Sequence, residues 1–349
     1  MAALAHQIDR RLSRRRQSLW LLSLALLVSF VLALLLGSVS LASLDVARAL
    51  LGLELPGYTA QIIQSIRLPR ALLAAGVGAI LAICGAILQG LFRNPLADPS
   101  LIGVTAGASV GASLMIVLGA SLGGALGGLA GMSLVSIGAF LGGLLTVWLV
   151  YRVATGINGT SVATMLLMGI AVSALSASMT GLMDYFADNE MLRRMSLWRM
   201  GGLDGANYPR ALLAGAVLAL LLFTIPAFGR ALNTLLLGES QARHLGIDVE
   251  RLKTRLIVLV AAGVGMAVAV SGSIAFVGLV VPHMVRLWVG PDHRILLPLS
   301  ALGGAVLLLL ADTFARTALA PAELPVGLVT ALLGAPFFIS LLRRRRDFE

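Results

Sequence analysis

The sequence predicts an all-α membrane protein with about ten membrane-spanning helices and an inverted internal repeat. Of its 349 residues, 58% are hydrophobic and 12% are charged. Soluble domains carry about 25% charged residues. Uncharged runs such as 99–151 and 153–183 can supply consecutive spans, because about 20 apolar residues cross the hydrocarbon core. We therefore expect a single transmembrane domain over 1–349.

The ends of the apolar runs give the spans and their orientation. We place the spans at 19–41, 70–92, 101–119, 131–152, 161–183, 210–228, 255–271, 274–290, 295–312 and 325–342. Only Ser271-Gly272-Ser273 separates the two short spans that follow Arg255. Arginines gather at both chain ends, and positive residues favour the cytoplasm. Both ends should then be cytoplasmic, which requires an even number of spans and keeps the short pair separate.

This topology assigns each connecting segment to one side of an inner membrane. The cytoplasmic segments are 1–18, 229–254 and 343–349, and the loops 121–130 and 184–208 lie outside. The net charge of +10 does not indicate nucleic-acid binding, because the basic residues lie at span ends, where positive charge sets orientation. Lipid is the expected surrounding partner.

A short motif is repeated with an offset of 187 residues. The segment 75–78 (Ala-Gly-Val-Gly) recurs at 262–265, and Ala82, Gly85 and Pro95 match Ala269, Gly272 and Pro282 at the same offset. In the expected topology the first copy runs inward and the second runs outward. Inverted repeats of this kind are typical of transporters, although chance matching of small residues is the alternative.

Small residues also recur every four positions along two neighbouring spans. These are Gly103, Gly107 and Gly111, followed by Gly138 and Gly142. Such spacing lets helix backbones approach closely in lipid. We interpret it as tight helix packing.

The sequence contains no catalytic constellation. The only lysine, Lys253, is not in a phosphate-binding loop. We therefore expect that this chain is not an enzyme and does not itself bind ATP. The single cysteine, Cys84, lies mid-span and is expected to be a packing residue. We expect no cofactor or metal in this chain. A proton-coupled transporter, which also uses inverted repeats, is the rival from another class.

The largest inner loop, 230–254, contains two candidate short helices. Gly238 and Gly246 bracket about two helical turns, with Ala242 and Leu245 expected on one face. The segment 248–253 is expected to form a second polar helix. Short helices with exposed apolar residues can dock a cytosolic partner. An ordinary solvated loop is the alternative.

Several motifs together resemble a known family. They are Arg67-Leu68-Pro69-Arg70, the run from Gln89 to Val104 that contains Arg93-Asn94-Pro95-Leu96, the loop residues 237–246, Gly278 to His283, Ala322 to Gly327, and Leu333 to Phe338. In this order they resemble the FecCD family of type II ABC-importer permeases, which move iron-siderophores, haem or vitamin B12. The resemblance covers nearly the whole chain.

The resemblance implies an architecture and partners. It implies ten helices in each subunit of a homodimer, with the path at the interface. It also implies two cytoplasmic ATPase subunits, which bind ATP and Mg, and a periplasmic substrate-binding protein. The stretch from Arg93 to Gly103 is most similar to haem permeases, so haem is the expected cargo. A ferric siderophore and vitamin B12 are the alternatives.

The resemblance also implies roles for three groups of residues. ATPase coupling is expected at Gly238, Glu239, Ala242, Arg243, Leu245 and Gly246. Docking of the binding protein, against glutamates on its two lobes, is expected at Arg67, Arg70 and Arg316. These arginines could instead anchor helix ends or reach lipid phosphate.

The third group is a gate on the cytoplasmic side. It is expected at Asn94, Leu96, Thr160 and Ser161. Asn94-Pro95 should break the helix at the inner surface, and the resemblance implies that this turn and the fifth span close the path. The alternative is that Asn94 only caps the following helix.

Overall fold

A computed structural model describes residues 2–39, 41–53, 57–121, 129–157 and 159–346. Its elements are, in chain order, α1 (Ala2–Leu35), α2 (Ser43–Leu50), α3 (Gly57–Gln61), the π-helix η1 (Ile62–Arg67), α4 (Leu68–Leu91), the 3₁₀ turn η2 (Pro99–Ile102), α5 (Val104–Ser121), α6 (Leu129–Ala154), β1 (Thr155–Gly156), β2 (Gly159–Thr160), α7 (Val162–Phe186), α8 (Asn189–Met200), α9 (Tyr208–Leu235), α10 (Glu239–His244), α11 (Val249–Ser271), α12 (Val277–Val289), α13 (His293–Thr317) and α14 (Val326–Arg346).

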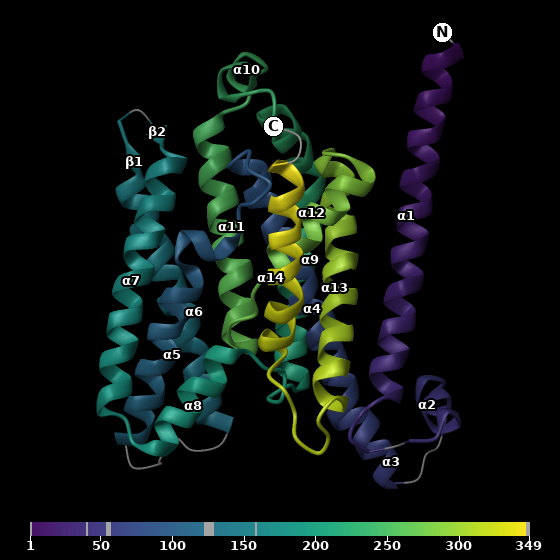
Figure 1. Cartoon of the computed structure of the whole chain (residues 1–349), viewed down its shortest axis with the longest axis vertical. Helices are drawn as coiled ribbons and strands as arrows, with labels where there is room; N and C mark the ends of the chain where they lie inside the picture. The colour runs from purple at the N-terminus through teal and green to yellow at the C-terminus, as the bar shows by residue number, and fades with distance from the viewer. Residues whose placement is uncertain (1, 40, 54–56, 122–128, 158, 347–349) are drawn as a thin grey trace.

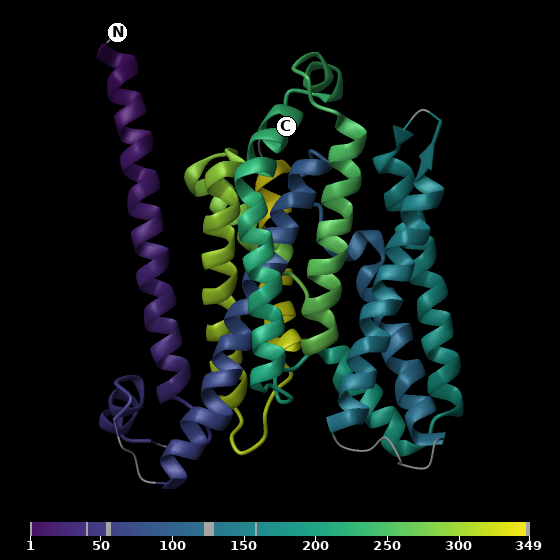
Figure 2. The same cartoon turned by 180° about the vertical axis from the view of Figure 1, so that it is seen from behind.

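The long helices run side by side as a bundle (Figure 1). Within the described residues, seven helices are long and apolar enough to cross a membrane, and α5, α12 and α14 supply three shorter apolar helices. Together they occupy every span expected from the sequence, which confirms the all-α membrane fold. Both termini, α10 and the β1–β2 hairpin lie at one end, hereafter the α10 end, while α2, α3 and α8 lie at the other (Figures 1 and 2).

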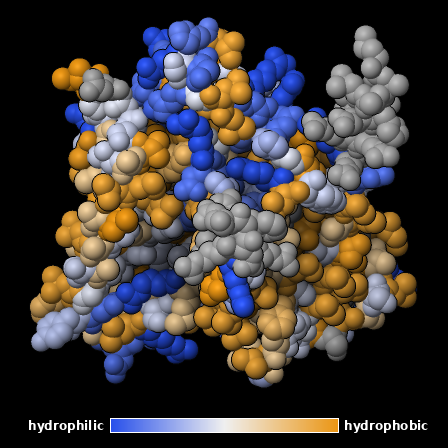
Figure 3. Space-filling view, turned by 45° about the horizontal axis from the view of Figure 1, so that its top comes forward, coloured by the Kyte–Doolittle hydropathy of each residue, from blue (hydrophilic) through white to orange (hydrophobic). Residues whose placement is uncertain are grey.

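The outer surface of the bundle is mostly hydrophobic, as contact with lipid requires. Figure 3 shows hydrophobic residues over most of its flanks and hydrophilic residues gathered at the α10 end. Helix α4 is instead enclosed: 89% of its most apolar window is buried, against 22% for α1. Its neighbours include α9, α11, α12 and α13. An enclosed helix can be apolar on every side, as α4 is.

Glycines allow the closest helix approaches, as the spacing of four predicted. A Cβ on Gly111 would overlap the carbonyl oxygen of Gly138, and one on Gly107 would overlap that of Gly142. These contacts confirm tight packing between α5 and α6. Gly103 behaves differently, because it ends η2 in the left-handed conformation with φ 79° and precedes α5.

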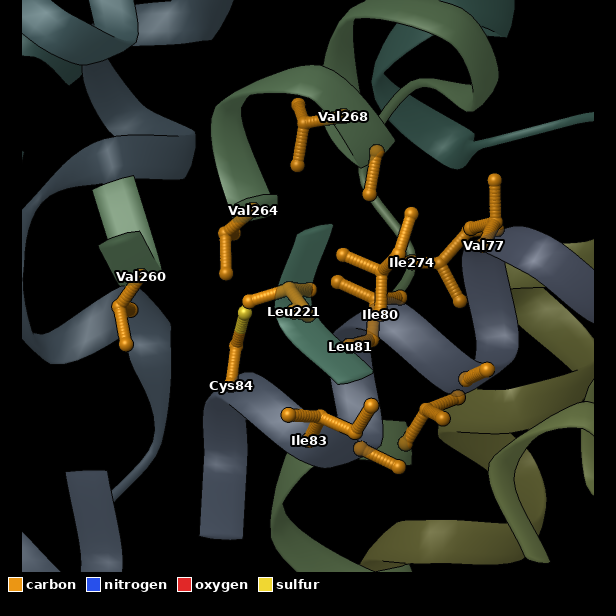
Figure 4. Close-up of a cluster of buried hydrophobic side chains, with 14 of the residues drawn as sticks. Val77, Ile80, Leu81, Ile83, Cys84, Leu221, Val260, Val264, Val268 and Ile274 are labelled. Carbon is orange, nitrogen blue, oxygen red and sulfur yellow. The ribbon is translucent and has the colours of Figure 1, made fainter. Parts of the chain in front are cut away.

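Cys84 is a packing residue, as expected. It is fully buried where α4, α9 and α11 meet, close to Leu221 and Val264 (Figure 4). A Cβ on Gly263 would lie 2.8 Å from its sulfur.

Helices α4 and α11, which carry the two copies of the repeated motif, run in opposite directions (Figure 1). These opposite directions agree with the inverted repeat. The matching glycines of the two copies have different neighbours, because Gly78 contacts the backbone of Gly304 and Gly265 contacts the ring of Phe140.

Two expected boundaries are wrong. The segment 248–253 is not a separate polar helix, because Asp248 caps α11 by accepting from the Arg251 amide and the helix then continues to Ser271. Arg316 does not lie in a loop between spans, because α13 extends to Thr317. The separation of α11 and α12 is confirmed. The chain breaks there at Gly272 (φ 67°) and Phe276 (φ 68°), backbone conformations that a helix cannot contain.

Candidate coupling, gating and docking sites

Helix α10 projects from its end of the bundle between two glycines with positive φ. Gly238 precedes it at φ 112° and Gly246 follows it at φ 82°. The Gly246 amide donates to the Arg243 carbonyl and the Ile247 amide donates to the Ala242 carbonyl. This is the Schellman arrangement, which satisfies the last carbonyls of a helix and favours glycine in the left-handed conformation.

The apolar residues of this projection do not share one face. Ala242 is fully buried against the bundle, whereas Leu245 is 65% exposed and Leu237 is 64% exposed. The expectation that Ala242 and Leu245 share a face is therefore wrong, because the turn after the helix directs Leu245 outward. Leu237 and Leu245 form the exposed apolar surface, and a partner that covered them would gain by burying them.

The predicted coupling and gating residues meet at Lys253. Its Nζ lies 2.9 Å from Glu239 Oε2, 3.1 Å from Glu250 Oε1 and 3.0 Å from the Thr160 carbonyl oxygen. Arg243 lies 3.8 Å from both carboxylates. Sequence reasoning did not assign a role to Lys253. The available signal was a lone lysine three residues after a glutamate on a helix.

The β1–β2 hairpin leads directly into α7. Thr155 pairs with Thr160, and their hydroxyls lie 3.0 Å apart. Ser161 caps α7 by accepting from the amide and the hydroxyl of Thr164. The Thr160 amide donates to Glu250 at 2.8 Å. Thr160 and Ser161 therefore fix where α7 begins.

The turn after α4 approaches the same region with different residues from those expected. A cavity of about 270 Å³ is lined by residues 91–93, 159–162, Glu239 and Lys253. Asn94 and Leu96 are not among its lining residues. The Asn94 side chain accepts from the Leu96 amide at 3.0 Å, which is a contact within the turn. The following helical turn η2 is capped by Asp98, so the alternative that Asn94 caps it is wrong. Burial raises the pKa of the Asp98 carboxyl, although hydrogen bonds from Ser100 oppose this effect. The gate remains a prediction.

The three docking arginines are buried at the opposite end. Arg67 is 4% exposed and donates to the carbonyls of Leu34 (2.6 Å), Leu35 (2.8 Å) and Val39. Gly37 leaves room for it, since a Cβ there would lie 2.7 Å from its guanidinium. Arg67 thus satisfies the last carbonyls of α1.

Arg70 and Arg316 share one buried carboxylate. Arg70 lies 2.9 Å from Asp312 Oδ1 and 2.8 Å from Glu323 Oε2, and Arg316 lies 3.0 Å from Asp312 Oδ2. Arg316 also donates to the Ala33 carbonyl at 3.0 Å. Asp312 is 1% exposed, whereas the Glu323 side chain is 37% exposed. These contacts are those of helix anchors, and docking of a binding protein stays a prediction.

Hydroxyl groups line a hollow between α5 and α7. It has a volume of about 430 Å³, and its lining includes Ser100, Thr105, Ser109, Ser173 and Ser273. Ser109 donates to the Thr105 carbonyl. Hydroxyls gathered in one hollow are unusual for a surface that faces lipid, where polar groups lack water.

Comparison with known proteins places this arrangement in one family. The profile of the FecCD transport family matches residues 25–344. The chain belongs to the FecCD transport family. The hemin transport system permease protein HmuU of Yersinia pestis is 44% identical over 327 residues, which cover 93% of this chain and 96% of that one. The cobalamin import system permease protein BtuC of Halobacterium salinarum is 44% identical over 82% of this chain and 75% of that one.

A solved structure is similar to this chain over nearly its whole length. It is described as a metal-chelate type ABC transporter in an inward-facing conformation. It superposes with a TM-score of 0.82 at 34% sequence identity, covering 94% of this chain and 99% of that one. As a FecCD family member, the chain is a multi-pass ABC permease subunit of the inner membrane, and it is not itself the catalytic subunit. The family implies an ATPase and a binding protein as partners. The comparisons give no support to the proton-coupled alternative.

Proposed function

We propose that this chain is the membrane subunit of an ATP-driven importer that passes haem from a periplasmic binding protein to the cytoplasm. The observation that carries this proposal is the match to the hemin permease, which combines 44% sequence identity with coverage of 96% of that relative. Among the vitamin B12 permeases, that of Halobacterium salinarum has equal identity but is covered over only 75% of its length, and that of Salmonella paratyphi A is covered over 97% of its length at 41% identity. Vitamin B12 is therefore the second candidate cargo, and a ferric siderophore is the third.

The proposed assembly is a homodimer with two ATPase subunits at the α10 end and the binding protein at the other. The hollow between α5 and α7 supports this arrangement, because its hydroxyls suit a water-filled path between two copies better than contact with lipid. The exposed Leu237 and Leu245 support a partner at α10. ATP and Mg would be bound by that partner.

The test is transport by the reconstituted complex. The permease, its ATPase and its binding protein are placed in liposomes, and uptake of labelled haem, labelled cobalamin and a labelled ferric siderophore is measured with and without ATP. We expect ATP-dependent haem uptake that an excess of the other two cargoes does not inhibit. ATP-dependent uptake of cobalamin or siderophore without haem uptake would replace the cargo. The absence of ATP-dependent uptake of all three would overturn the proposal.

A further inference from the structure

Lys253 is a buried cation whose bonding capacity is fully used. Its side chain is 4% exposed, and its three contacts reach three different elements: Glu239 of α10, Thr160 of β2 and Glu250 of its own helix α11. An ammonium group has three N–H donors and no acceptor. The geometry thus places all three donors on defined oxygens, and a buried charge of this kind is stable only when it is paired in this way.

The contacts of Lys253 hold the hairpin by its backbone. The carbonyl of Thr160 accepts from Lys253, and the amide of Thr160 donates to Glu250 at 2.8 Å. Glu250 also lies against Gly159, since a Cβ there would be 2.6 Å from its carboxylate. Both backbone groups of the residue that precedes Ser161, the cap of α7, are therefore fixed by side chains of α11.

The other side of the hairpin contributes less packing. The cavity of about 270 Å³ separates residues 159–162 from the end of α4 at 91–93, and Ile157 at the hairpin tip is fully exposed. Beyond its covalent links to α6 and α7, the hairpin is thus held by polar bonds from α11 rather than by apolar packing against α4. A displacement of α10 changes those bonds directly, because Glu239 is its first residue and contacts the same ammonium group.

We propose that Lys253 is the positioning residue that transmits a displacement of α10 to the hairpin at the start of α7. This inference rests on the proposed function, in which the ATPase acts on α10. The shift passes from Glu239 to the ammonium group and from there to the Thr160 carbonyl. Because Thr160 adjoins the cap of α7, the hairpin and the beginning of that helix move with α10. Without the ammonium group, the direct bonds between α10 and the hairpin are lost, and only the longer route from Arg243 through Glu250, which begins with a contact of 3.8 Å, still joins these described residues.

The experiment combines a distance measurement with coupling in the reconstituted complex. Nitroxide labels at Ile157→Cys and Ser240→Cys report the separation of the hairpin and α10 with and without ATP. Lys253→Met removes the charge and keeps the length of the side chain. Arg255→Met is the matched control, because it removes an exposed cation two residues later on the same helix.

We expect the wild-type chain and Arg255→Met to show a narrow label separation in each nucleotide state. In Lys253→Met that distribution broadens, and cargo moved per ATP hydrolysed falls by about tenfold, as expected for the loss of a charge-assisted hydrogen bond. Lys253→Arg, which keeps the charge, restores part of the coupling. A merely structural lysine would reduce ATP hydrolysis and transport in proportion and leave the labels unchanged, and that result would overturn the inference.

Glu239→Gln tests the link between α10 and the hairpin if the Lys253→Met variant does not assemble. This substitution keeps the side-chain volume, weakens the contacts of residue 239 with Lys253 and with Arg243, and leaves the ammonium group paired with Glu250. We expect it to broaden the label separation as well, and an unchanged separation would refute the inference. The label measurement needs no cargo. A wild-type complex that hydrolyses ATP and carries no haem would refute the proposed cargo alone.

Discussion

Replacing Gly246 with valine changes one backbone conformation at the end of α10 and removes no side-chain contact. Gly246 has φ 82°, and a Cβ built on it would meet nothing within 4 Å. The left-handed conformation costs a residue with a Cβ about 1–2 kcal/mol, and β-branched residues fare worse. Since about 1.4 kcal/mol is a factor of ten in an equilibrium constant, the capped form of α10 should be depopulated about tenfold relative to a frayed one.

The expected result is an inserted protein that hydrolyses ATP and transports poorly. The assay is cargo taken up per ATP hydrolysed in proteoliposomes, with membrane insertion checked by protease protection. Gly246→Asn is the matched control, because asparagine also adds a side chain at this position but tolerates the left-handed conformation. Normal coupling by Gly246→Val would refute the reasoning. Equal loss in both variants would show that a side chain clashes with a partner and that backbone conformation is not the cause.

Three further predictions concern topology, gating and anchoring. A cysteine at Asn189 should react with an impermeant reagent in intact cells, and a cysteine at Ser240 should not. The reason is that the arginines at both chain ends place the α10 end in the cytoplasm. The reverse labelling pattern would invert the topology. A cysteine at Leu96 should cross-link to its copy in the closed homodimer, and failure in every nucleotide state would exclude that gate. Arg70→Met should lower the free energy of unfolding by about 3 kcal/mol, because Asp312 is left under-compensated; an unchanged thermal midpoint in detergent would contradict this.

The parts of the fold that local sequence determines were predictable. Long apolar runs define spans because lipid leaves the backbone no alternative to helix. Glycines four residues apart identify a close helix contact, and Gly111 and Gly138 confirm it. The polar stretch 248–253 misled the prediction, because polarity marks the membrane boundary and does not end a helix. Asp248 caps α11 there, and the helix continues through Gly263 and Gly265 to Ser271.

The contacts of the candidate sites were not predictable, because their partners are distant in sequence. The sequence gives the side of the membrane on which Arg70 lies, but its carboxylates come from positions 312 and 323. Lys253 likewise meets Thr160 only after α6 and α11 have packed together, which brings β2 beside α11. The sequence identified Glu239 and Thr160 for separate roles, and tertiary structure joins them through one ammonium group.

The bonds from Arg67 to the end of α1 bear on the order of membrane insertion. The last carbonyls of α1 at Leu34 and Leu35 have no partner within the helix itself, and the group that satisfies them arrives about thirty residues later. Helix α1 therefore enters the bilayer with unpaired backbone carbonyls at its end, and water or lipid headgroups must supply their hydrogen bonds. The first two spans, joined by α2 and α3, form the smallest hairpin that satisfies the carbonyls of Leu34 and Leu35, whereas the Ala33 carbonyl accepts from Arg316 of α13. A nascent chain released before Arg67 emerges would lack these bonds, so the end of α1 is satisfied only when the start of the second span has joined it.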